Sequence, residues 1–239
     1  MKSLYVFFIL YLPLSIFAQS WVDLGIKGGW GANLIINNNL FNDNAYNHKL
    51  SSGYSFGGKI GFNFNQEHEI TFDAMFTTFR QGFTYSIEDT INDVTTNYSS
   101  EFGFNAVNLI LMYRRNKNGS YLEFGPCISF LQSPYFKDGA NDYIMGANNF
   151  NLNNQGLVLG FGSYIVGTEN FGITSGIRIT HYLSDLLSEE GKNNLLFSSK
   201  QYDSYTPSKA LFIELVLEAN FDFAYMAKAS CGRKKILFF

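Results

Sequence analysis

The feature that most constrains the fold is an alternation of apolar and polar residues, which is clearest between Leu211 and Phe223. Every odd position in this segment is apolar, whereas the even positions carry the polar residues, including Glu214, Glu218 and Asp222. Successive side chains of a strand point to opposite faces, and a helix would mix the two sets. The segment is therefore predicted to be a strand with one apolar and one polar face.

Seven other segments follow the same rule, which brings the prediction to eight strands. Most are about ten residues long, close to the ~9–11 residues of a tilted transmembrane strand and longer than the ~5–6 of globular strands. The seven segments are Trp21–Trp30, Tyr54–Phe64, Glu69–Phe79, Phe104–Arg114, Tyr121–Leu131, Leu157–Ile165 and Phe171–His181.

The connections between these segments alternate strictly between long and short. The short ones lie around 65–68, 116–119 and 167–170, and the long ones are Gly31–Gly53, Arg80–Gly103, Gln132–Gly156 and Tyr182–Ser208. Outer-membrane barrels combine tight periplasmic turns with longer extracellular loops. The pattern therefore predicts an all-β fold, an eight-stranded antiparallel up-and-down transmembrane β-barrel, with both ends of the barrel segment in the periplasm and four loops outside.

Glycines and charges indicate which face points inward. Most strand glycines lie on the polar face, and an eight-stranded lumen is only just wide enough for side chains, so small residues are expected there. Charges of both signs share that face and are predicted to form a structural network in the lumen. A closed network is favoured over a narrow path for water or small solutes. The predicted network residues are Asp23, Lys27, Lys59, Glu69, Asp73, Glu123, Arg178, Glu214, Glu218 and Asp222.

The N-terminus has the pattern of an export signal. Lys2 precedes an apolar stretch from Leu4 to Phe17, and the small Ala18 follows as the expected cleavage position. The predicted organisation is a signal peptide at 1–18, an outer-membrane barrel at 19–225 and a C-terminal tail of unknown role at 226–239. The net charge of −3 and the absence of a basic tract argue against a nucleic-acid partner.

Residues that could carry chemistry are few. His48, His68 and His181 are scattered, so no metal site and no cofactor are predicted. The sharpest enzymatic hypothesis joins His181 to Ser184 and Asp185, because nucleophilic catalysis needs a hydroxyl, a base and a group that orients the base. An interfacial histidine followed by a polar loop explains the same residues, and we expect no catalytic site.

Three stretches of the sequence carry a family resemblance. The signal end Phe17-Ala18-Gln19, the opening strand Gly25-Ile26-Lys27-Gly28-Gly29 and the second strand Gly57-Gly58-Lys59-Ile60-Gly61-Phe62 resemble PorT-like outer-membrane β-barrel proteins of Bacteroidota. The resemblance implies an eight-stranded barrel in the outer membrane of a Gram-negative cell. Some members serve protein secretion, but no residue here carries that role over. The tail beyond Tyr225 departs from the family pattern.

The expected function is that of an outer-membrane β-barrel with a structural, binding or secretion-accessory role. Its partners would be outer-membrane lipid and a protein that binds the extracellular loops, with the lumen closed by polar side chains. Two alternatives stay open at this point. One is an outer-membrane lipid-modifying enzyme that uses His181, and the other is a soluble periplasmic barrel that binds an apolar ligand inside.

Overall fold

The computed structural model describes residues 20–64, 67–89, 94–139, 143–168, 170–194 and 202–225. Within these ranges each of the eight predicted segments lies in a β-strand. The strands are β1 (Ser20–Ile36), β3 (Ser51–Phe64), β4 (His68–Asp89), β5 (Val94–Lys117), β6 (Ser120–Asp138), β8 (Asn153–Gly167), β9 (Phe171–Tyr182) and β10 (Lys209–Tyr225). The predicted signal peptide 1–18 and tail 226–239 lie outside the described residues.

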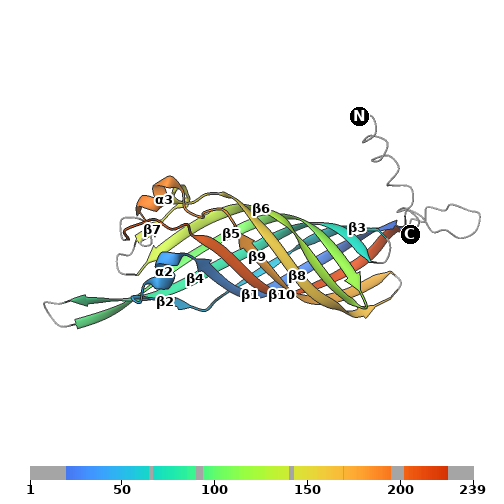
Figure 1. The fold of residues 1–239 in the computed structure, drawn as a ribbon, viewed down its shortest axis with the longest axis horizontal. Helices are drawn as coiled ribbons and strands as arrows, with labels where there is room; N and C mark the ends of the chain where they lie inside the picture. The colour runs from blue at the N-terminus through green and yellow to red at the C-terminus, as the bar shows by residue number, and fades with distance from the viewer. Residues whose placement is uncertain are drawn as a thin grey trace, which may run out of the picture.

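These eight strands close into a ring in which every neighbouring pair is antiparallel (Figure 1). The order around the ring is the order along the chain, and β10 closes the ring by pairing with β1 from Trp21↔Tyr225 to Ile36↔Lys209. Because closure leaves no free strand edge, the backbone ladder runs around the whole wall. The predicted fold class, an antiparallel up-and-down barrel of eight strands, is confirmed.

Short and long connections lie at opposite ends of the barrel (Figure 1). At the turn end, where β1 starts and β10 ends, β5 and β6 are joined through Asn118 and Gly119. These residues have φ angles of 53° and 77°, and positive φ at both positions is what a tight two-residue hairpin requires. The opposite end, called the loop end below, carries the helical turns α2 (Asn38–Asn42), η2 (Ala147–Asn149) and α3 (Glu189–Asn194).

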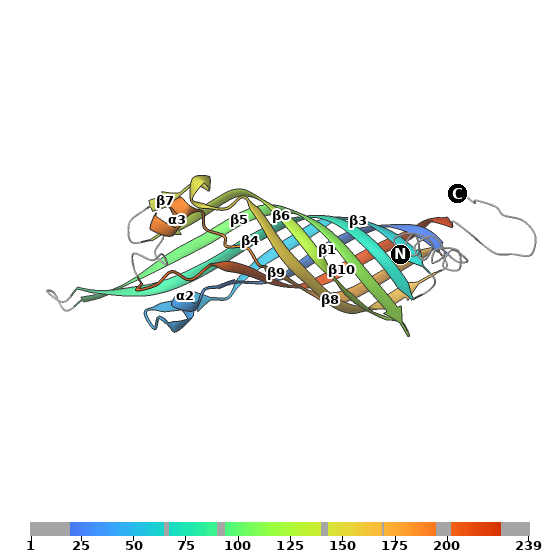
Figure 2. The same ribbon diagram turned by 45° about the horizontal axis from the view of Figure 1, so that its top comes forward.

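The prediction that Arg80–Gly103 forms a loop is wrong for its described residues. β4 and β5 continue through it as 22- and 24-residue strands and extend beyond the ring at the loop end (Figure 2). β2 (Tyr46–Lys49) pairs with β4 there, and β7 (Tyr143–Met145) pairs with the end of β6. We call β2, β7 and the outer parts of β4, β5 and β6 the protruding sheet. Phe83 and Tyr85 of its β4 part are buried. They alternate with polar residues, but this alternation is short, and the surrounding Ser-, Thr- and Asn-rich sequence was interpreted as a loop.

The lumen has an apolar half at the loop end. Phe79 and Phe104 stack there at 4.7 Å, and Leu40, Phe150 and Leu187 reach in from the connecting segments. The expectation that polar side chains close the lumen therefore holds only for the other half, because loop residues supply enough apolar surface to fill the mouth. None of the helices described is long and apolar enough to cross a membrane.

Candidate functional site

The wall of the barrel is apolar outside and charged inside. Leu215 on β10 is 57% exposed, whereas its neighbour Glu214 is 4% exposed. Every strand of the ring contributes exposed apolar side chains to an outer band. Examples, one for each strand, are Ile26, Phe56, Phe72, Leu111, Phe124, Leu159, Ile177 and Leu217. This polarity is the reverse of that of a water-soluble protein, in which charged groups are almost never fully buried unless paired.

The charges inside the barrel interact electrostatically with one another, and we call this group the lumen network. It consists of Asp23, Lys27, Lys59, Glu69, Asp73, Arg114, Glu123, Arg178, Glu214 and Glu218, all buried. Nine of the ten residues predicted from sequence belong to it. The tenth, Asp222, lies half-buried at the turn end of β10.

Glu218 and Arg114 are at the centre of the lumen network. Arg114 donates through Nη1 and Nη2 to the two oxygens of Glu218 at 2.7 and 2.6 Å, and through Nε and Nη2 to Glu123 at 3.0 and 2.7 Å. Lys27 and Lys59 each lie 3.0 Å from Glu218. Such bidentate, charge-assisted contacts are the strong class of hydrogen bond.

A second group of contacts crosses the lumen to β4 and β9. Arg178 lies 2.8 Å from Glu123 and 3.1 Å from Asp73, and Lys27 lies 2.6 Å from the same Asp73 oxygen. Glu214 accepts a hydrogen bond from Ser55. The network holds six carboxylates and four cations. Because unpaired burial of charge is costly, pairing of this density is what allows the groups to stay inside.

Arg114 was missed by sequence reasoning. It is followed by Arg115, which is on the outer face with a half-exposed side chain, so only one of the two arginines points inward. The outward Leu111 and Tyr113 assign Arg114 to the inner face by alternation. That signal is weak, because Met112, on the same inner face, is also apolar and blurs the pattern.

The lumen network is covered by the apolar core on one side and opens on the other. A polar pocket of about 230 Å³ lies at the turn end, lined by residues that include Asp23, Asn63, Tyr164 and Asn220. Asp23 is the network residue that lines this pocket, which places the polar end of the lumen at the turn end. The ion pairs of the lumen network connect strands on opposite sides of the lumen.

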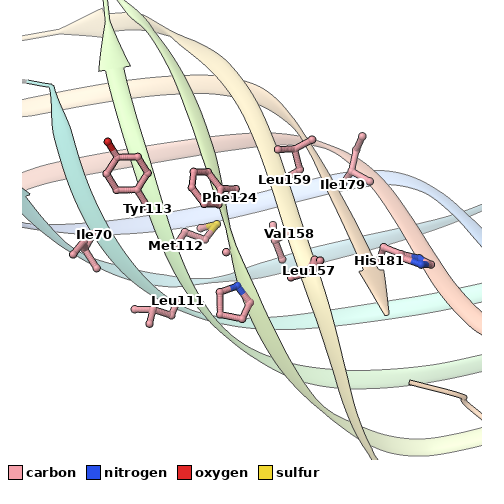
Figure 3. Close-up of a pocket in the computed structure, with 12 residues that line it drawn as sticks. Ile70, Leu111, Met112, Tyr113, Phe124, Leu157, Val158, Leu159, Ile179 and His181 are labelled. Atoms are coloured by element: carbon pink, nitrogen blue, oxygen red, sulfur yellow. The ribbon is translucent and has the colours of Figure 1, made fainter. Parts of the chain in front are cut away.

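A second hollow lies on the outer wall between β5, β6, β8 and β9 (Figure 3). This wall groove has a volume of about 610 Å³ and an almost wholly apolar lining. Leu111, Phe124, Leu157, Leu159 and Ile179 contribute side chains from the outer face, and His181 lies towards the loop end. Met112 and Val158, which belong to the lumen core, also line it.

The hypothetical catalytic group of His181, Ser184 and Asp185 is not assembled by hydrogen bonds in the described residues. Ser184 accepts a hydrogen bond from the Gln155 backbone at 3.0 Å. Asp185 accepts from the Ser208 backbone at 3.0 Å and from the Tyr205 hydroxyl. Burial and this bond to Asp185 raise the pKa of Tyr205 above its ordinary value. Asp185 therefore holds loop segments together.

The other two histidines have packing partners. His48 stacks on Phe41 at 4.8 Å and meets Phe83 edge-on, and burial lowers its pKa. His68 Nδ1 lies 2.6 Å from the Tyr113 hydroxyl. Over the described ranges no group of three or more acidic, histidine or cysteine side chains is placed to hold a metal ion. Cys127 is buried as a free thiol, and Cys231 lies outside the described residues.

Comparison with known proteins finds likeness in structure alone. No family model and no curated protein sequence matches the chain. Neisserial surface protein A is 11% identical, with a TM-score of 0.43 over 84% of this chain and 97% of that one. Ail, the attachment invasion locus protein of Yersinia pestis, is 13% identical, with a TM-score of 0.39 over 84% and 99%. The outer membrane protein OprG from Pseudomonas aeruginosa is 10% identical, with a TM-score of 0.37 over 86% and 96%.

Proposed function

We propose that this chain is an outer-membrane β-barrel whose wall anchors the protruding sheet and whose loop end binds a partner outside the cell. The observation that carries the proposal is the reversed polarity of a closed ring. A closed barrel satisfies its backbone hydrogen bonds internally, which any membrane-spanning structure must do. Its outer band is apolar on every strand, and its charges face the lumen.

The reversed polarity favours this proposal over the soluble alternative. A soluble barrel that binds an apolar ligand would place charge outside and an apolar cavity inside. Here Ile26 is 67% exposed and Phe56 is 55% exposed, while Lys27 and Lys59 are each 3% exposed. Soluble monomers rarely expose contiguous apolar patches larger than a few hundred Å². A band of this kind around the whole ring is suited to lipid.

The loop end is the part of the protein best suited to bind a macromolecular partner. The protruding sheet extends past the ring, and the connecting segments below it are held by specific contacts (Figure 2). Tyr202 donates to Asp43 at 2.9 Å, and Asn37 donates to Ser208 at 2.9 Å. A fixed surface reduces the ordering cost of binding. We therefore assign the binding role to this end rather than to the lumen.

The lipid-modifying enzyme remains a second candidate because His181 lines the wall groove. For this activity a nucleophile would have to approach the histidine, and Ser184 is bonded instead to Gln155. Replacement of His181 by Ala with no change in lipid A composition would remove this candidate.

The proposal is tested by a pair of arginine substitutions at exposed leucines. Leu217 lies in the middle of the outer band and is 54% exposed, whereas Leu50 lies between β2 and β3 and is 91% exposed. An arginine on the lipid face costs about 2–4 kcal/mol near the bilayer midplane. We expect Leu217→Arg to reduce outer-membrane recovery and the gel shift on boiling, and Leu50→Arg to leave both unchanged. Equal behaviour of the two variants, or recovery of the unchanged protein without detergent, would contradict the proposal.

A further inference from the structure

The wall groove lies where the backbone ladder between β5 and β6 is interrupted. The paired residues run from Ile110↔Cys127 directly to Tyr113↔Phe124, with the same register on both sides. In the window between them, the Gly125-Pro126 segment of β6 has no partner residue on β5. Proline has no N–H to donate, and it is normally excluded from the interior of a sheet.

At Gly125 the two strands stay in close contact although the ladder is interrupted. A Cβ atom at this position would lie 1.9 Å from the Leu111 carbonyl oxygen, which no side chain could tolerate. On its other edge β6 keeps its pairing with β8, through Gly125↔Val158 and Pro126↔Leu157. The interruption of the ladder is therefore confined to one seam of the wall, and Met112, which is 1% exposed, lies at the floor of the groove.

The chemistry of the groove specifies an apolar chain with a polar end. Its volume of about 610 Å³ falls within the roughly 300–1,000 Å³ of small-molecule sites. The Tyr113 hydroxyl is already bonded to His68. His181 Nδ1 is buried and has no hydrogen-bond partner among the described residues. A buried polar atom without a partner is costly, so a ligand group that bonds this nitrogen after the His181 ring turns towards the groove would be stabilised.

We propose that the wall groove binds one acyl chain of a lipid from the surrounding leaflet, with the polar end of that lipid at His181. This inference rests on the proposed membrane location. The groove opens on the apolar outer band, so a lipid reaches it directly from the hydrocarbon phase. The groove gives the chain a concave, apolar seat along the seam between β5 and β6, with Met112 at its floor (Figure 3).

The test uses the folded barrel in phosphatidylcholine vesicles that contain a small fraction of phosphatidylcholine with a photoactivatable diazirine in mid-chain. After irradiation, peptide mass spectrometry compares labelling around Leu111 and Leu157 with labelling around Ile26 and Phe56, which lie across the ring. We expect about tenfold more labelling at the groove, the effect of ~1.4 kcal/mol of preferential binding.

Matched substitutions test whether the labelling depends on the wall groove and on His181. Leu157→Trp fills the groove and is expected to reduce its labelling to the level of the rest of the wall, whereas Ile26→Trp on β1 leaves it unchanged. His181→Ala is expected to lower groove labelling, and His181→Gln, which keeps a hydrogen-bonding group, to retain it. Equal effects of Ala and Gln would overturn the role of His181.

The outcomes separate this inference from the proposed function. The gel shift on boiling is measured on the same samples, so insertion is known for each variant. An inserted barrel labelled evenly around its wall would overturn the groove inference alone, as would groove labelling that Leu157→Trp does not reduce. An unchanged protein that fails to insert would contradict the proposed membrane location, and the groove inference with it.

Discussion

Replacement of Arg114 by methionine tests whether the lumen network stabilises the barrel. The guanidinium makes four hydrogen bonds of 2.6–3.0 Å to Glu123 and Glu218, and it lies 3.7 Å from Glu69. Its side chain has no exposure to solvent. Methionine preserves much of the apolar length and removes only the charge and the donors.

The size of the loss follows from the partners that remain. Removal of one member of a buried ion pair costs about 3–5 kcal/mol, because the other charge is left uncompensated. Glu218 keeps Lys27 and Lys59, each at 3.0 Å, and Glu123 keeps Arg178 at 2.8 Å. We therefore expect the lower end, about 3 kcal/mol. The change also leaves six carboxylates against three cations in the network.

The assay is reversible urea unfolding in detergent micelles, followed by tryptophan fluorescence and by gel mobility. Arg115→Met is the matched control, because Arg115 adjoins Arg114 but has a side chain that is 53% exposed and lies 3.9 Å from Glu67. Exposed pairs contribute at most about 1 kcal/mol. Adding Glu123→Gln to Arg114→Met reduces the excess of carboxylates over cations in the network and should recover part of the loss. Similar stabilities of the Arg114 and Arg115 variants, or no recovery in the double variant, would refute the reasoning.

Two further predictions concern the wall and the loop end. Gly125→Ala should destabilise the barrel by about 1–3 kcal/mol or more, because the added Cβ would collide with the backbone of β5. Gly58→Ala is the control: its added Cβ would have no neighbouring atom closer than 3.7 Å, so the unfolding free energy should change by less than about 0.5 kcal/mol. The pKa of Tyr205 is raised, which means that the folded state favours the neutral phenol. The hydrogen bond from this phenol to Asp185 therefore contributes its full stability below the ordinary pKa of 10.0, and that stability is lost as the pH rises towards the pKa of the folded state. Amide hydrogen exchange of residues 182–194 should therefore accelerate above about pH 10, and Tyr205→Phe should make this pH dependence less steep. An equally steep pH dependence in the Tyr205→Phe variant would contradict the prediction.

The ring could be predicted from sequence because each wall strand carries its own evidence. Along β10 the apolar Leu215 and Leu217 face outward, and Glu214 and Glu218 face inward, so a single segment shows both the strand and its polarity. The protruding sheet gave a weaker signal. Its strands pair with one another, for example Tyr46↔Tyr85, and they bury single aromatic side chains such as Phe83 and Phe102 among many polar residues. Pairing between distant segments leaves little trace in one sequence.

The network could be predicted only as a set of inward charges. Alternation assigns a face to each residue, but it does not say which charges meet across the lumen. The contact between Arg114 and Glu218 joins β5 to β10 over 104 positions, and it depends on the stagger of all the strands. The wall groove was beyond sequence reasoning for a similar reason, because Gly125 and Pro126 suggest a weak point only once their neighbours on β5 are known.

The lumen network and the wall groove belong to one structural arrangement. Arg114 pairs with Glu123 in register immediately beyond the window where β5 and β6 lose their ladder. On the other side of the window, the Tyr182 hydroxyl donates to Asn108 on β5 at 2.9 Å and accepts from Ser129 on β6 at 2.8 Å. Side-chain bonds on the lumen face therefore link the two strands on both sides of the gap. A hydrogen bond to a charged group contributes about 1.5–3 kcal/mol, against about 0.5–1.5 for a backbone bond, so the Arg114 contacts can offset the missing backbone pairs. The charges inside the barrel thus help to hold β5 and β6 together where the backbone ladder between them is interrupted.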